Sequence, residues 1–183
     1  RRTVPPEARR ELARLVCEIQ MLQGGEPTQA LELIAELDSE GIRTEIDPEL
    51  RRSLLRGAGQ FQQLLAEIDR ATARTEIDDE KLALTLHAVE LLEQKLGQPL
   101  EAARRLGPII ERFPERRDLV SRARQLYAAA KEPLLALQLV EREMRLAAPH
   151  EMPQFHIARG ELLLAAGADN EAEAALLRVL VGS

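Results

Sequence analysis

The stretch GQPLEAARRL, residues 97–106, occurs in two related forms elsewhere in the chain. GEPTQALELI spans residues 25–34 and KEPLLALQLV spans residues 131–140, and both keep the proline and the alanine in the same places. A glycine suits a helix end because it adopts a left-handed conformation without a Cβ clash. A proline two residues later suits the first turn of the next helix, where its missing N–H is not needed. The phrase therefore predicts a helix, a tight turn and a second helix.

The same turn can be placed at five points along the 183 residues. The turn positions are 34, 38, 34 and 36 residues apart, and apolar residues follow each of them by five and by nine residues. They are Gly25, Gly59, Gly97, Lys131 and Gly167. No short run of alternating apolar and polar residues indicates a strand. The sequence predicts an all-α chain that forms a single αα-hairpin solenoid. Its five hairpins are expected at approximately residues 5–40, 47–74, 79–113, 115–148 and 151–183.

The motif RTEID precedes two of the predicted helices, at residues 43–47 and 74–78. Asp47 and Asp78 are predicted N-caps, because an aspartate side chain can accept a hydrogen bond from the first unpaired amides of a helix. Pro48 and Asp79 would then occupy the first helical positions, which favour proline and negative charge.

A helix–turn–helix unit of about 34 residues resembles the tetratricopeptide repeat family. The resemblance rests on a small residue and a tyrosine in the first helix, a turn glycine, an early alanine in the second helix, and a closing proline. These residues are Gly160, Gly167 and Ala172 in the fifth hairpin, Gly97, Ala102 and Pro114 in the third, and Tyr127, Ala136 and Pro149 in the fourth. The resemblance implies a right-handed superhelix whose concave surface, lined by first helices, binds a peptide or a protein.

The chain departs from the pattern of this family at several positions. It has no tryptophan, and Leu64 stands where the early alanine is expected. Charged residues replace the small first-helix residue at Glu18, Arg52, Glu90 and Arg124. HEAT-like packing, with a period of about 40–47 residues, is the nearest alternative. In both architectures hairpins stack because none can bury its apolar face alone.

Composition excludes several classes of function. The net charge of −6 argues against nucleic-acid binding, including the RNA-reading hairpins of pentatricopeptide arrays. No apolar run approaches the ~18 residues of a membrane-spanning helix, so we expect no direct membrane insertion. The chain begins RRTVPPE, without a methionine, and we expect it to be a fragment of a longer protein. Its compartment, cytoplasmic or periplasmic, stays open. The single cysteine, Cys17, is expected to be a small apolar residue inside a helix.

The sequence shows no motif with catalytic geometry. His150, Glu151 and His156 lack the HExxH spacing that places two metal-binding histidines on one helix face. His87 is isolated, and no glycine-rich phosphate loop follows a strand. We therefore expect no enzyme activity, no cofactor and no metal. The paired arginines, such as Arg104 and Arg105, are expected to lie on solvated helix faces balanced by acids, as Glu101 would balance Arg105.

The leading hypothesis is a non-catalytic scaffold that binds a peptide or protein partner through the concave surface of its first helices. The candidate partner-binding residues are polar first-helix positions outside the stacking seam, namely Arg56, His87, Gln94, Lys95, Arg122 and Gln125.

The alternative is a structural spacer or self-assembly platform in a larger bacterial-type secretion, exopolysaccharide-export or signalling protein. Leu176, Leu180 and Val181 in the last helix have no downstream hairpin to cover them. Self-association through this C-terminal face is therefore left open.

Overall fold

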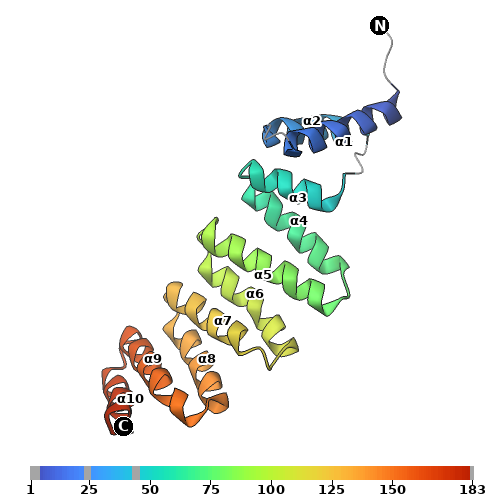
Figure 1. Ribbon diagram of the computed structural model, residues 1–183. Helices are drawn as coiled ribbons and strands as arrows, with labels where there is room; N and C mark the ends of the chain where they lie inside the picture. The colour runs from blue at the N-terminus through green and yellow to red at the C-terminus, as the bar shows by residue number, and fades with distance from the viewer. Residues whose placement is uncertain (1–4, 23–25, 43–45, 182–183) are drawn as a thin grey trace. The chain divides into compact units, whose positions relative to one another are not determined.

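The structure is a computed structural model that describes residues 5–22, 26–42 and 46–181. Within these residues it contains ten α-helices, one short 3₁₀ helix and no strand (Figure 1). The first helices of the hairpins are α1 (Pro6–Leu22), α3 (Pro48–Gly57), α5 (Asp78–Gln94), α7 (Arg117–Ala129) and α9 (Met152–Ala165). The second helices are α2 (Pro27–Ser39), α4 (Phe61–Arg74), α6 (Pro99–Arg112), α8 (Pro133–Leu146) and α10 (Asp169–Val181), and the 3₁₀ helix η1 is Pro149–Glu151. The predicted all-α fold of five helical hairpins is confirmed.

The turns lie where the repeated phrase predicts them. Gly59, Gly97 and Gly167 have φ angles of 69°, 63° and 77°, and Lys131, which replaces the glycine in the fourth hairpin, has a φ of 59°. These values belong to the left-handed region that ends many helices. Gly25, the fifth predicted turn position, lies outside the described residues.

The residue five positions after each turn is fully buried in every hairpin. These residues are Ala30, Leu64, Ala102, Ala136 and Ala172, each 0% exposed. Four of the five are alanines, because the two helices of a hairpin approach closely at this point and leave little room for a side chain. The common burial shows that the predicted register of the second helices is right.

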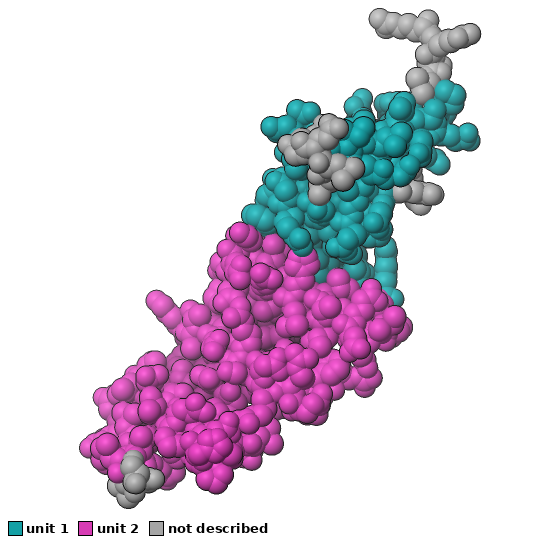
Figure 2. Space-filling model, viewed as in Figure 1, with its two compact units in different colours: residues 1–74 teal, residues 75–183 magenta. Residues whose placement is uncertain are grey.

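The chain divides into two compact units, residues 1–74 and residues 75–183 (Figure 2). In unit 1, α1 packs against α2 and α3, α2 also packs against α3, and α3 packs against α4. In unit 2 each helix from α5 to α10 packs against the next one along the chain. Within both units, therefore, the second helix of one hairpin contacts the first helix of the next. The prediction of one continuous array across the whole chain stays a prediction.

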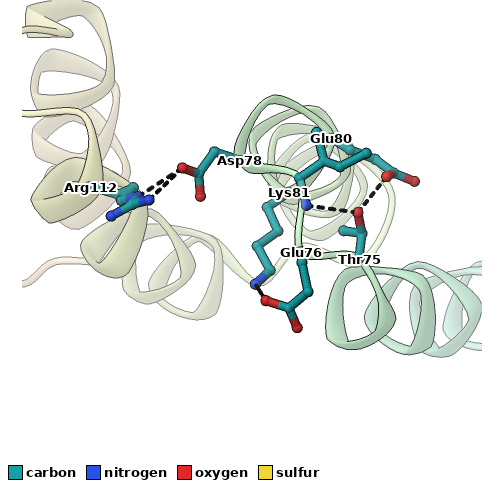
Figure 3. A network of polar contacts seen from close by, with 7 residues as sticks. Thr75, Glu76, Asp78, Glu80, Lys81 and Arg112 are labelled. Carbon is teal, nitrogen blue, oxygen red and sulfur yellow. Dashed lines mark hydrogen bonds and ion pairs between the residues drawn. The ribbon is translucent and has the colours of Figure 1, made fainter.

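The start of α5 differs from the sequence prediction. Asp47 caps α3 as predicted, since its side chain accepts a hydrogen bond from the Glu49 amide at 3.3 Å. In α5, however, the N-cap residue is Ile77, and Asp78 is the first residue of the helix. No side chain caps the helix, and Oγ1 of Thr75 accepts the Ile77 amide at 3.2 Å in the turn before it (Figure 3).

Asp78 forms an ion pair instead of a cap. Its Oδ2 accepts hydrogen bonds from Nη2 and Nε of Arg112 at 2.6 and 3.0 Å (Figure 3). These bonds hold the pKa of the Asp78 carboxyl below its ordinary value. The pair ties the first turn of α5 to the last turn of α6, so it closes the open end of the third hairpin.

Candidate interaction surfaces

The six candidate residues from the sequence are distributed over three first helices. Arg56 is exposed on α3 in unit 1. The other five lie in unit 2, with half-buried His87 and exposed Gln94 on α5, exposed Lys95 at its C-cap, and half-buried Arg122 and exposed Gln125 on α7. Five of the candidates therefore lie in unit 2, whereas Arg56 lies in unit 1.

One ion pair links the candidate residues of α7 to α5. The Arg122 guanidinium contacts the carboxylate of Glu93, which is next to Gln94 in the sequence. This contact draws the polar surface of α7 toward that of α5. The side chains of Gln94 and Gln125 add neutral amide groups that can donate and accept hydrogen bonds. The surface is therefore polar and can hydrogen-bond a peptide backbone.

Sequence analysis missed an apolar stripe on α1. Leu12, Leu15 and Ile19 are 54%, 39% and 49% exposed, although they are large hydrophobic residues. Their spacing of three and four residues places them on one face of the helix. Together they form what we call the α1 stripe. This spacing is visible in the sequence and could have predicted the stripe.

The α1 stripe is separate from the face that holds the first hairpin together. Ala13 and Cys17, on a different side of α1, are 1% and 0% exposed. Cys17 clusters with Ala30 and Ile34 of α2, as the sequence predicts for a small apolar residue. Burial raises the pKa of its thiol. Helix α1 therefore has two apolar faces, and only one of them is covered within unit 1.

Charged residues beside the α1 stripe neutralise one another. Arg14 Nη2 lies 2.6 Å from Oε1 of Glu11, and Arg14 also pairs with Glu18. The Arg14 hydrogen bond lowers the pKa of the Glu11 carboxyl. Because these charges are already paired, the stripe offers an apolar contact surface without a strong net charge next to it.

A second group of exposed apolar residues lies on the last hairpin. Leu180 and Leu177 of α10 are 76% and 49% exposed, and Leu164 of α9 is 52% exposed. Leu176 was expected to be uncovered, but it is half-buried, and a Cβ on Gly160 of α9 would approach its side chain to 2.6 Å. The side chain of Val181 lies outside the described residues. The uncovered surface therefore centres on Leu177 and Leu180.

The surroundings of Glu151 and His156 shift the pKa of each side chain. Glu151 accepts the Ala148 amide at 2.7 Å and pairs with Arg117 at 3.2 Å, and the two contacts lower the pKa of its carboxyl. Burial lowers the pKa of His156, with a further contribution from Arg178. In the described part of the chain, no three or more His, Cys, Asp or Glu side chains are arranged to hold a metal ion.

The arginine pairs are balanced by acids as the sequence predicts. Arg105 Nε lies 3.4 Å from Oε1 of Glu101, which is the predicted i, i+4 pair. Other pairs join Arg9 to Glu40, Arg51 to Glu67, Arg52 to Glu49, and Arg116 to Asp118. None of the described helices is long and apolar enough to cross a membrane.

No family model matches the chain, and no curated protein matches it. The chain is similar to a solved structure described as "MamA RS-1 ArsTM double mutant". The two are 16% identical, with a TM-score of 0.48, over 95% of this chain and 94% of that one.

Proposed function

We propose that this chain is a non-catalytic scaffold that binds a protein or peptide partner through its first helices. We also infer that its hairpins are divergent tetratricopeptide-like repeats. The observation that carries the function is the α1 stripe, because three large apolar side chains on one exposed helix face are typical of an interaction surface. The polar residues on α5 and α7 would extend partner recognition in unit 2.

A capture experiment with matched variants tests this proposal. The immobilised protein is incubated with an extract of its source cells, and bound proteins are identified by mass spectrometry. The variant Leu12→Gln/Leu15→Gln keeps helix propensity and charge but removes the apolar contact surface. We expect it to lose partners that the wild-type protein captures.

The control variant is Leu134→Gln/Leu146→Gln, which changes two leucines of α8 that are 66% and 53% exposed. It alters a similar apolar area outside the first helices and should retain the captured partners. If both variants capture the same proteins as the wild type, the α1 stripe is not the binding surface. The variants Lys95→Glu and Gln125→Glu test the polar candidates in the same assay.

A second candidate function is self-assembly, with the chain as a spacer in a larger protein. Exposed Leu177 and Leu180 on α10 favour it, because an uncovered leucine pair can pack against a second copy. Light scattering would then show a multimer that Leu177→Gln/Leu180→Gln converts to a monomer. A wild-type protein that scatters as a monomer at every concentration would contradict self-assembly.

A further inference from the structure

Unit 1 contains a groove that is distinct from the exposed surfaces described above. It is a pocket of about 440 Å³ formed by one face of α2, by α3 and by the start of α4. Leu31 and Ile34 of α2 and Leu55 of α3 supply its apolar lining. Its volume falls in the range of pockets that hold small ligands or a few residues of a peptide. The groove shares no residue with the α1 stripe.

The polar residues of the groove are acidic on one wall and neutral on the other. Glu32 and Asp38 of α2 are exposed carboxylates that line it. Glu32 forms no ion pair with any residue in the described ranges. Across from α2, Gln60 and Gln63 supply side-chain amides. Arg51 also lines the groove, and its Nε lies 3.4 Å from Oε1 of Glu67, a carboxylate that it shares with Arg70, so the lining carries two carboxylates and one cation.

In unit 2 an ion pair joins two of the second helices near their ends. Glu111 of α6 and Arg142 of α8 lie fourteen and eleven residues after their turns, and Arg142 Nη1 is 2.8 Å from Glu111 Oε1. This pair bridges the second helices of consecutive hairpins. The same two positions in unit 1 hold Ser39 and Arg70.

Ser39 and Arg70 cannot form such a bridge. Ser39 Oγ donates to the Glu36 carbonyl of its own helix at 2.7 Å, and Arg70 pairs with Glu67 of its own helix at 2.8 Å. Thirteen residues after the turn, unit 1 has exposed Asp38, where α6 has buried Ile110. The second helices of unit 1 therefore lack this bridge, and Asp38 adds a carboxylate to the lining of the groove.

We propose that this groove binds a basic segment of a partner protein in which a lysine or arginine stands next to an apolar residue. The cationic group pairs with Glu32 on the acidic wall, where opposite charges attract. The apolar side chain packs on half-buried Leu31. Gln60 and Gln63 hydrogen-bond the peptide backbone, since an amide can both donate and accept. The proposal goes beyond the scaffold function because it adds a second binding site with its own chemistry.

Fluorescence anisotropy on the full chain tests the groove with a defined probe, a labelled short peptide of alternating lysine and leucine. We expect Glu32→Lys to weaken binding by at least about tenfold, because it places like charges together at the site. Glu36→Lys is the matched control, since Glu36 is an exposed carboxylate of the same helix that does not line the groove. It should change the affinity by less than about twofold.

Two further variants distinguish binding in the groove from nonspecific electrostatic attraction between the peptide and the protein. Ala35→Phe fills the exposed end of the groove without changing charge, and we expect it to weaken binding while the helical circular dichroism is retained. Leu12→Gln/Leu15→Gln should leave peptide binding unchanged, even if it abolishes partner capture. The proposal is overturned if Glu32→Lys and Glu36→Lys weaken binding equally, or if an alternating glutamate and leucine peptide binds as well. It is also overturned if no binding is detected at ~1 mM peptide.

Discussion

Lys131 shows how one residue can occupy a turn that was built for glycine. Its φ of 59° is the only positive value of a residue other than glycine among the described residues. The turn is held by two backbone bonds, from the Lys131 amide to the Ala128 carbonyl at 3.0 Å and from the Glu132 amide to the Tyr127 carbonyl at 2.9 Å. These bonds satisfy carbonyls at the end of α7, so they offset the steric cost of the Cβ.

Replacing Lys131 by glycine should stabilise the protein. The substitution removes a left-handed conformation that costs about 1–2 kcal/mol, and the greater freedom of glycine in the unfolded chain offsets part of the gain. We expect a net increase of about 0.5–1 kcal/mol in the free energy of unfolding, measured by urea denaturation. Lys131→Ala is the control, because it removes the charge but keeps the Cβ. An equal gain from both variants would mean that the charge, not the backbone, causes the effect.

Gly160 is small because α9 and α10 approach closely there. A Cβ at this position would lie 2.6 Å from Cγ and Cδ2 of Leu176. We expect Gly160→Ala to lower the free energy of unfolding by about 1–3 kcal/mol, although alanine favours a helix. Gly107→Ala is the matched control, since a Cβ there meets nothing within 4 Å apart from its chain neighbours. It should change the free energy of unfolding by less than about 1 kcal/mol, because the gain in helix propensity is offset by contact of the new Cβ with Pro108. If thermal unfolding shows equal losses for the two variants, close packing does not explain Gly160.

At the scale of the elements, the sequence predicts helices and turns well because their signals are local. Gly59, Gly97 and Gly167 mark helix ends through backbone conformation, which depends only on neighbouring residues. The N-cap of α5 is predicted incorrectly, because Asp78 is the first residue of the helix and pairs with Arg112, which is distant in sequence. Surfaces are predicted least well. The groove in unit 1 is formed by residues from α2, α3 and the start of α4, and residue spacing does not record contacts between helices.

The fourth hairpin contains a buried ion pair that explains two departures from the repeat pattern. Arg124 stands at the small-residue position of α7, and Glu143 stands at an otherwise apolar position of α8. Arg124 Nε donates to Glu143 Oε2 at 2.7 Å, and Glu143 is only 5% exposed. Each charge would be unfavourable alone, but the two compensate each other across the hairpin.

A double-mutant cycle should reveal this compensation. Arg124→Leu alone leaves a buried carboxylate without its partner, and we expect a loss of about 2–4 kcal/mol in the free energy of unfolding. Arg124→Leu/Glu143→Leu replaces the pair with an apolar contact and should recover most of that loss. Chemical denaturation of the wild type, both single variants and the double variant gives the coupling energy. Additive losses would show that the two residues do not depend on each other.

At the scale of the whole molecule, a regular repeat conceals the division into two units. The repeated phrase spans residues 25–34, 97–106 and 131–140 in nearly the same form, so it predicts one array. The division between residues 74 and 75 has no counterpart in the repeated phrase, because the phrase records only the local turn of each hairpin. Unit 2 has its own buried cluster, which includes Val140 and Phe155, and its first helix is anchored by the pair between Asp78 and Arg112.

A chain of residues 75–183 should therefore fold by itself. It retains the Asp78–Arg112 ion pair and the buried cluster, whereas a chain of residues 1–74 is near the lower size limit for a single core. We expect residues 75–183 to show helical circular dichroism and one cooperative urea transition, which matches the later of two transitions in the full chain. Residues 99–183 serve as the control, because removing α5 exposes apolar residues of α6 such as Ala102 and Leu106, which are buried in the full chain. This shorter chain should unfold at a much lower urea concentration. If residues 75–183 are unfolded in isolation, the two units do not fold independently, and the stability of unit 2 depends on unit 1.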